Sequence, residues 1–250
     1  VADALLEPAA AEIDVHALHH GFLKQARANG GQLLTDVEVT GLARSGGRWL
    51  LETPRGTFTA GIIVNAAGAW ADELAALAGA SPIGIQPLRR TALIVEAPEG
   101  CAIDRWPMTV DIDEEFYLKP DAGRVLISPA DESLSDPCDA QPDEYDVAVA
   151  VDRIEKATTL RIERIQNKWA GLRSFAPDRN PVIGFDPQVE GFFWLAGQGG
   201  YGIQTSFGAA LLGAALLEGG AAPASLTDLG LDPAELSPSR FPVQAAAANG

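Results

Sequence analysis

Residues suited to ligand binding are concentrated between positions 169 and 204. A buried-looking arginine, Arg173, stands in the run Ala170-Gly-Leu-Arg-Ser-Phe-Ala-Pro. Further along, an apolar segment at 192–195 opens through Gly197-Gln-Gly-Gly-Tyr-Gly into a predicted helix. The start of such a helix offers free N–H groups and a positive dipole end. This arrangement is typical of a site for an anionic or electron-rich ligand.

The glycine run matches G-x-G-x-x-G, which indicates a dinucleotide site when it stands between a strand and a helix. A Rossmann unit also needs a second parallel strand after that helix, with an Asp or Glu at its end. Here the chain continues from Gly219-Gly220 into a tail rich in Ala and Pro. We therefore expect this turn to present a helix N-terminus to a cofactor whose adenylate part binds elsewhere.

Composition limits the possible partners. The net charge of −16 over 250 residues argues against nonspecific nucleic-acid binding and against anchoring on anionic lipid. No apolar run reaches the roughly 18 residues that a transmembrane segment needs. Cys101 and Cys138 are too few for a disulfide scaffold, so we expect a reducing, cytoplasmic location, with peripheral attachment to the inner membrane as an alternative. No metal site is expected: His16 and His20 could share a helix face, but no Glu or Cys completes a ligand set.

The predicted elements follow an interrupted order. The first part contains a helix at 14–28, β segments at 32–35 and 37–42, a hairpin at 48–60, a buried parallel strand at 62–65 and a helix to 78. Antiparallel strands at 88–97, 116–119 and 125–128 follow, then a helix or helix pair at 143–164. From 169 the first pattern resumes with a loop, the strand at 192–195 and a helix at 203–217. We expect a nucleotide-type α/β domain (1–78 and 168–250) that holds an inserted sheet domain (79–167).

Four segments together suggest a family. They are Val37-Glu-Val-Thr-Gly-Leu, Val64-Asn-Ala-Ala-Gly-Ala-Trp-Ala-Asp, the stretch 170–184 and Gly197-Gln-Gly-Gly-Tyr-Gly-Ile-Gln. With these segments the chain resembles the flavin-dependent D-amino-acid oxidase superfamily, which includes glycine oxidase, sarcosine oxidase and D-amino-acid dehydrogenases. Segments at 104–107, 113–120 and 128–132 make it most similar to the bacterial D-arginine dehydrogenase type.

The resemblance implies an α/β (α+β) fold. Residues 1–78 and 168–250 would form an incomplete, Rossmann-like FAD-binding domain, and 79–167 an inserted antiparallel-sheet substrate domain. Members of the family begin with a G-x-G-x-x-G unit that binds the ADP half of FAD, whereas this chain starts at Val1 without it. We therefore expect a truncated chain whose partner is the missing N-terminal FAD-binding segment, on the same or a separate chain.

The resemblance also implies substrate contacts. Arg173 would form a two-pronged salt bridge to the substrate carboxylate, and the Tyr117 hydroxyl would donate to the same group. Arg90 would be a further contact; its neighbour Arg89 would face the other way, although the register could be shifted by one residue. The alternatives are a structural ion pair for Arg173 and a half-buried strand position for Tyr117.

The cofactor implied by the resemblance is FAD. Val39 would contact adenine, Ala67 and Gly68 would lie at the diphosphate, and Trp70 would pack beside the flavin or in the core. Gln204, also counted with the catalytic residues, starts the last helix, whose dipole would stabilise the anionic reduced flavin. Close packing by glycine is the alternative for that turn. The expected FAD contacts are Val39, Ala67, Gly68, Trp70, Gly171, Gly199, Gly200, Tyr201, Gly202, Ile203 and Gln204.

The implied reaction is the oxidative deamination of a small-molecule D-amino acid, with hydride transfer from Cα to flavin N5. The imino acid would hydrolyse to a 2-oxo acid and ammonia, and no side chain is required as a general base. Acids at 111–115 could favour a cationic substrate side chain or form a solvated strand end. Two alternatives remain: an oxidase of glycine, sarcosine or a similar amine, and a non-catalytic subunit or fragment of a split flavoprotein.

Overall fold

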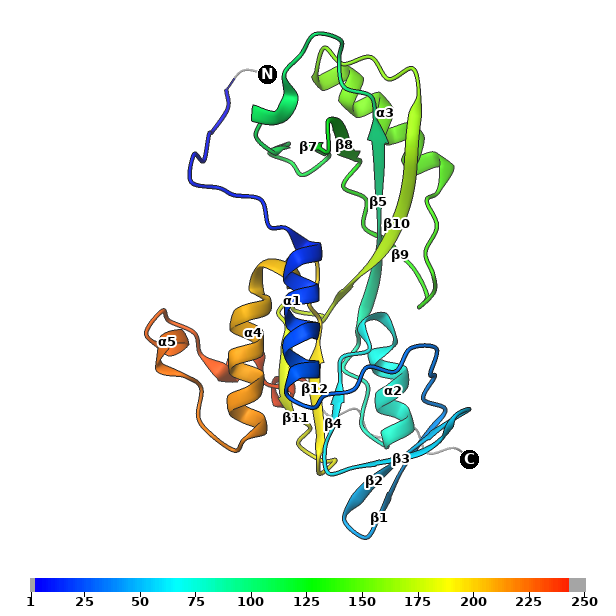
Figure 1. Cartoon of the computed structure of the whole chain (residues 1–250), viewed down its shortest axis with the longest axis vertical. Coiled ribbons are helices and arrows are strands. Elements are labelled where there is room, and N and C mark those ends of the chain that lie inside the picture. Colours follow the sequence, from blue (N-terminus) through cyan, green and yellow to red (C-terminus); the bar gives the residue numbers. More distant parts are fainter. Residues whose placement is uncertain (1–2, 243–250) are drawn as a thin grey trace. The chain divides into compact units, whose positions relative to one another are not determined.

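The computed structural model describes residues 3–242. They fall into two compact units (Figure 1). The sheet unit is Gln86–Phe175, and the α/β unit comprises the described residues of Ala2–Ile85 and Ala176–Gly250. Both boundaries lie a few residues later than the predicted 79 and 167, because the longest strands of the sheet unit begin at Gln86 and end at Phe175.

The α/β unit contains both helices and strands. Its helices are α1 (Val15–Ala28), α2 (Ala71–Ala78), α4 (Gly202–Leu217) and α5 (Ala224–Thr227), with short 3₁₀ turns η1 (Gly68–Trp70), η3 (Pro233–Leu236) and η4 (Pro238–Arg240). Its strands are β1 (Gly41–Ser45), β2 (Arg48–Thr53), β3 (Gly56–Ala60), β4 (Ile63–Asn65), β11 (Val182–Phe185) and β12 (Phe192–Ala196). They form an antiparallel sheet, β1-β2-β3, and a second sheet of order β11-β12-β4.

The second sheet positions two turns at one edge. Strands β12 and β4 are parallel, with Trp194 opposite Asn65. The carboxyl ends of parallel strands meet at the same edge of a sheet, so the turns into α2 and α4 both start there. Trp194 and Phe192 are fully buried with Trp49 in the core beneath the sheet. This core fixes the strands from which both turns leave.

The sheet unit is an antiparallel sheet with one long helix. Its elements are β5 (Gln86–Val95), η2 (Ile103–Arg105), β6 (Thr109–Val110), β7 (Tyr117–Asp121), β8 (Arg124–Ser128), β9 (Ser133–Leu134), α3 (Glu144–Ala157) and β10 (Ile165–Phe175). The strand order is β10-β5-β8-β7-β6, and β9 also pairs with β5. Leu93 and Ile127 on one face of the sheet form a core with Val147 and Ile154 of α3. That face of the sheet is therefore closed by the helix.

Several predicted elements are confirmed. Helix α1 begins after Asp14, whose carboxylate accepts a hydrogen bond from Ala17 N at 2.9 Å. The 48–60 hairpin is β2 and β3, and the helix expected at 203–217 is α4. The mixed α/β class expected from the sequence is what the structure has.

Other details differ. Residues 32–35 form no strand in the described structure, because no neighbouring strand pairs with them. The helix expected to reach 164 ends at Ala157, since Thr158 is extended. Residues from 169 on, expected to form a loop, instead belong up to Phe175 to the long strand β10 (Ile165–Phe175), whose half-exposed pattern lacks the apolar run that marks a buried strand. Strand β4, expected to be fully buried, leaves Val64 41% exposed, because Val64 points to the opposite face from the buried Ile63 and Asn65.

Candidate functional site

The strand register of the sheet unit brings Arg90 and Arg173 onto one face. Arg173 on β10 lies opposite Leu88 of β5, and Gly171 lies opposite Arg90. Directly opposed residues of antiparallel strands point to the same face, as do residues two apart on one strand. Arg90, Gly171 and Arg173 therefore share a face. It is the face away from α3, because Leu93, which belongs to the α3 core, has the opposite parity.

Tyr117 belongs to the same face. Its neighbour Leu118 lies opposite Ile127, and both pack in the core under α3. Adjacent residues of a strand alternate between faces, so the Tyr117 side chain points away from α3. An electrostatic effect of Tyr117 on the Arg173 pKa agrees with this placement. Three residues that the sequence singled out as substrate contacts thus gather on one surface.

Arg173 is a half-buried cation without a fixed anionic partner. Among residues 3–242 its guanidinium has no hydrogen bond and no ion pair. Burial is the largest effect on its pKa and lowers it from its ordinary value, and the nearby positive charge of Arg90 lowers it further. Tyr117, Glu132 and Asp131 act in the opposite direction. Both pKa-lowering effects disfavour the charged guanidinium, so an anion bound beside Arg173 would be strongly favoured.

Arg90 is held in place by the chain that links β8 to β9. Its Nε donates to the Asp131 carbonyl oxygen at 2.7 Å, and its Nη2 donates to Glu132 Oε1 at 3.2 Å. The Arg90 side chain is 12% exposed. A cation fixed in this way is less free than Arg173 to bind a ligand with its whole guanidinium.

Arg89 points to the other face. Its Nη2 forms an ion pair with Asp146 of α3 at 2.8 Å and lies 3.6 Å from Asp143. The two neighbouring arginines therefore have different roles: Arg89 ties β5 to the helix, and Arg90 belongs to the open face.

Asp131 stabilises strand β5 at Thr91, the residue next to Arg90. On its β10 edge Thr91 lies opposite Ala170, but on the other edge no strand pairs with it, because the pairing with β9 ends at Arg89 and the pairing with β8 starts at Leu93. The Asp131 carboxylate fills this gap, because it accepts from Thr91 N at 2.7 Å and from Thr91 Oγ1 at 3.0 Å. Thr91 is fully buried, so both donors need that acceptor.

Asp131→Ala should lower the free energy of unfolding by about 2 kcal/mol, because two buried donors lose their acceptor. Asp131→Asn keeps an acceptor for Thr91 N and should cost less. Urea denaturation of both variants measures the difference. An alanine variant as stable as the asparagine variant would show that the carboxylate does not brace the strand.

The other predicted residues lie in the α/β unit, at the edge where β4 and β12 end. Ala67, Gly68 and Trp70 follow β4, and the glycine turn 197–201 with Gly202–Gln204 follows β12. Asn65 shapes the first turn: it is fully buried, accepts from Ala67 N and donates to the Ala71 carbonyl oxygen at 2.8 Å.

This edge fits a flat, electron-rich group such as a flavin. Helix α4 has no side-chain cap and no acidic residue in its first turn, so its N–H groups and dipole are open to a ligand. Gly68 has a φ of 58°, and a Cβ there would enter open space, so the backbone is accessible. Trp70 and Ile203 are 44% and 47% exposed, which leaves apolar surface beside these donors.

Two predicted contacts lie apart from that edge. Val39 lies in the irregular segment just before β1, and its backbone makes no hydrogen bond to other described residues. It is therefore free to contact a ligand. Gly171 belongs to the sheet unit, opposite Arg90, and not to the edge formed by β4 and β12.

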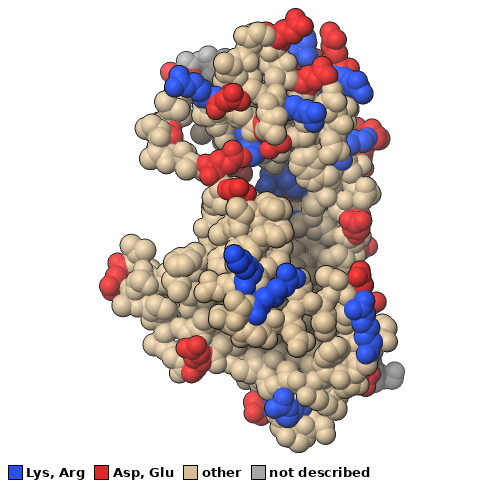
Figure 2. Space-filling view, viewed as in Figure 1, with Lys and Arg blue, Asp and Glu red and all other residues tan. Residues whose placement is uncertain are grey.

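The charged surface agrees with the acidic composition. In Figure 2 the Lys and Arg side chains on the visible face form small, separate groups among acidic and uncharged residues. Within residues 3–242 no helix is long and apolar enough to cross a membrane. Over the same range no three His, Cys, Asp or Glu residues gather in a way that could hold a metal ion.

Comparison with known proteins identifies the family. The family model described as "FAD dependent oxidoreductase", DAO, matches residues 1–216. The hydrogen cyanide synthase subunit HcnC of Pseudomonas aeruginosa is 28% identical over 202 residues, which are 78% of this chain and 46% of that protein. Mitochondrial dimethylglycine dehydrogenase of Mus musculus is 28% identical over 218 residues, which are 80% of this chain and 25% of that protein. This chain thus spans half or less of these curated relatives.

A solved structure has the same fold. Glycine oxidase from Geobacillus kaustophilus superimposes with a TM-score of 0.72 at 26% identity, over 90% of this chain and 58% of that one. The α/β class and the sheet arrangement are therefore those of this family.

Proposed function

Because the chain belongs to the DAO family of FAD-dependent oxidoreductases, we propose that it supplies the substrate face and the flavin-facing turns of a D-amino-acid dehydrogenase. The observation that carries this proposal is the unpaired Arg173 beside Arg90 and Tyr117 on the open face of the sheet unit. Two guanidinium groups and a phenol suit a carboxylate, the group that every amino acid offers. The preferred side chain is proposed to be basic, as in the D-arginine dehydrogenase type.

The chain's own residues would bind and orient the substrate. Arg173 would bind the carboxylate with two parallel hydrogen bonds, while Arg90 adds charge and the Tyr117 hydroxyl donates a third. Such a clamp fixes Cα relative to the protein, and positioning of this kind can supply much of the rate enhancement. Bound FAD would supply the acceptor for the hydride that leaves Cα.

The two carboxylates that act on the Arg173 pKa, Asp131 and Glu132, are already engaged. Asp131 is engaged by both Thr91 donors, and Glu132 pairs with Arg90. We therefore propose that the substrate amine binds in its neutral form. The imino acid product would then hydrolyse in water to a 2-oxo acid and ammonia.

FAD would be held by the turns after β4 and β12. Gly68, Trp70 and Gly199–Gln204 offer N–H groups and apolar surface there, and Ala67 and Val39 offer backbone to the diphosphate and adenine. The helix dipole of α4 would stabilise negative charge on the ring. Gly171, opposite Arg90 in the sheet unit, remains a proposed FAD contact.

A further segment would complete the FAD-binding part. In the described residues β4 pairs only with β12, and α1 buries none of its side chains. Phe22 is 45% exposed, Val64 41% and Phe207 66%, so apolar surface is left uncovered. We propose that an N-terminal segment, on the same or a second chain, covers it.

The specificity test is a substrate panel on the FAD-loaded protein. It contains D-arginine, L-arginine, glycine, sarcosine and agmatine, which is arginine without its carboxylate. The proposal expects turnover of D-arginine with a dye acceptor and none of agmatine. Equal turnover of agmatine would exclude carboxylate recognition.

A glycine or sarcosine oxidase is the second candidate, which the likeness to glycine oxidase supports. Faster turnover of glycine or sarcosine, with oxygen consumed, would favour this second candidate.

A further inference from the structure

The last described segment of the chain, residues 232–242, folds back over the α/β unit. We call it the C-terminal strap; it contains η3 and η4. Pro238 of the strap is buried on Gly184 of β11, where a Cβ would come within 2.9 Å of Pro238 Cδ. Leu236 and Phe241 pack against the two cores of the unit. The strap is therefore seated by specific contacts.

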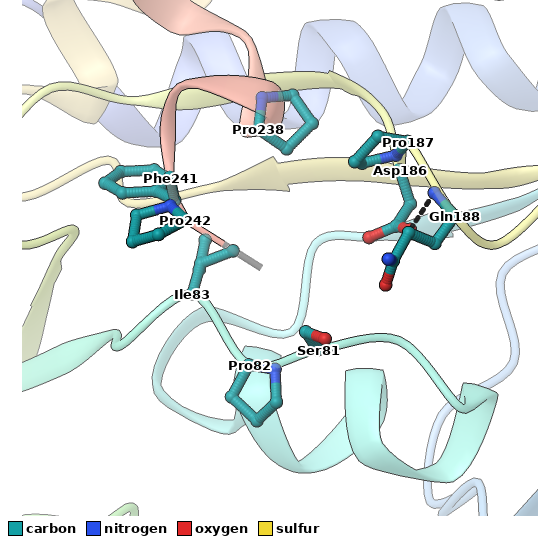
Figure 3. A pocket seen from close by; sticks show the side chains of 9 residues that line it. All are labelled: Ser81, Pro82, Ile83, Asp186, Pro187, Gln188, Pro238, Phe241 and Pro242. Carbon is teal, nitrogen blue, oxygen red and sulfur yellow. Dashed lines mark hydrogen bonds between the residues drawn. The ribbon is translucent and has the colours of Figure 1, made fainter. Parts of the chain in front are cut away.

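A small pocket marks where the strap crosses the unit. In Figure 3, Pro238, Phe241 and Pro242 of the strap line this pocket together with Ser81, Pro82 and Ile83. The acid on its wall, Asp186, is already used, because it accepts from Gln188 N at 2.9 Å and from Trp194 Nε1 at 3.0 Å. The pocket is thus a packing feature, and the chemistry of the strap lies at Arg240.

Arg240 joins the strap to the loop between β10 and β11, residues 176–181. Its Nε donates to Asp178 Oδ2 at 2.7 Å and its Nη2 to Asp178 Oδ1 at 3.1 Å. The same Nη2 donates to the Asn180 carbonyl oxygen at 2.9 Å. Nη1 donates to the Ser237 carbonyl oxygen at 3.0 Å, and the guanidinium lies 4.3 Å from the Phe241 ring centroid. A fork with this many partners fixes both backbone segments.

The 176–181 loop in turn contacts the glycine turn before α4. The Tyr201 hydroxyl donates to the Arg179 carbonyl oxygen. Gly197 also lies beside this loop: a Cβ there would be in ordinary van der Waals contact, 3.4 Å from Ala176 N and from Asn180 O. Tyr201 is also the N-cap residue of α4. A continuous set of contacts therefore runs from Arg240 through Asp178 and Arg179 to the start of that helix.

The ion pair between Arg240 and Asp178 is formed at neutral pH. The hydrogen bonds from Arg240 keep the pKa of Asp178 below its ordinary 3.8. A carboxyl whose folded pKa is lowered stabilises the fold above its unfolded pKa, and the effect is lost as the pH falls through the folded value.

We propose that Arg240 is a positioning residue for the flavin-facing start of α4, acting through Asp178 and the 176–181 loop. The inference rests on the proposed function, because it assigns the α4 N-terminus to FAD. Arg240 itself contacts no ligand in this account; it fixes the loop that fixes the turn.

The test measures the Kd for FAD and the absorption spectrum of the bound flavin in the full protein that carries this chain. FAD is titrated into the apoprotein of Arg240→Gln, Asp178→Asn and the double variant, and binding is followed by flavin fluorescence. Each single change should raise the Kd about tenfold, the loss expected for a charge-assisted contact. The double variant should bind no worse than the singles, because both changes break one link. Arg240→Lys keeps the charge without the fork and should fall in between.

Two further variants keep the test decisive. Tyr201→Phe removes the hydroxyl that reaches Arg179 and should also raise the Kd, even where an Arg240 variant does not fold. Asp152→Asn breaks an exposed ion pair with Lys156 on α3 and should leave the Kd unchanged.

An Arg240→Gln protein that melts earlier but keeps the wild-type Kd and flavin spectrum would overturn the inference, leaving the strap purely structural. FAD binding is measured without turnover. If the variants change the Kd for FAD as expected but the wild-type protein oxidises no amino acid, only the proposed function is contradicted. A wild-type protein that binds no FAD would overturn both.

Discussion

Replacing Arg173 by alanine should raise KM for the amino-acid substrate about a hundredfold, since two charge-assisted hydrogen bonds are lost. The effect should be mainly on KM, because the carboxylate is bound in both the ground state and the transition state. Steady-state kinetics over a wide substrate range measures it. Arg173→Lys should recover part of the loss, since lysine keeps the charge but not the fork.

Arg124→Ala is the matched control, because it removes an exposed arginine from β8 of the same sheet. It should change KM little. A normal KM in Arg173→Ala would show that this guanidinium does not bind the carboxylate, and the open face of the sheet unit would lose its assigned role.

Trp194→Ala should lower the free energy of unfolding by about 4 kcal/mol, the cost of emptying a large aromatic site in a core. Trp194 is fully buried on β12 between β11 and β4, and its indole N–H donates to Asp186. The strand that positions the glycine turn would lose its main packing residue, so FAD should be released at lower urea concentrations. Urea denaturation followed by flavin fluorescence reports both effects.

Trp169→Ala provides the comparison. This tryptophan is 41% exposed on β10, and its removal should change stability by less than about 1 kcal/mol. Equal losses in the two variants would mean that burial of Trp194 does not anchor the turn.

Local patterns predicted much of this fold. The capping Asp14, the hairpin at 48–60 and the apolar strand that opens into α4 are all encoded within a few neighbouring residues. Strand alternation likewise predicted that Arg89 and Arg90 would face opposite ways, which the ion pair from Arg89 to Asp146 agrees with. Where one segment contains the signal, reasoning from the sequence succeeded.

The missed features depend on partners far apart in the chain. Asp131 braces Thr91 from 40 positions away, and Arg240 binds Asp178 across 62. Neither pair has a local pattern that identifies its two members. Asp131 and Asp178 do lie in segments that carry the family resemblance, 128–132 and 170–184. Strand β10 was missed because its outward residues are polar or half exposed, so it lacks the apolar run of a buried strand. The expectation that Arg173 binds a carboxylate depended on the family resemblance, because the sequence around a single arginine does not identify its ligand.

Anaerobic reduction of the bound flavin tests the central claim most directly. The FAD-loaded protein is mixed with D-arginine or L-arginine without oxygen, and the visible absorbance of the oxidised flavin is followed. The account predicts rapid bleaching by D-arginine, none by L-arginine, and a requirement for about a hundredfold more D-arginine in Arg173→Ala. Two results would contradict the account. One is a flavin that stays oxidised in the presence of D-amino acids, and the other is a flavin in Arg173→Ala that is reduced at the same substrate concentration as in the wild type.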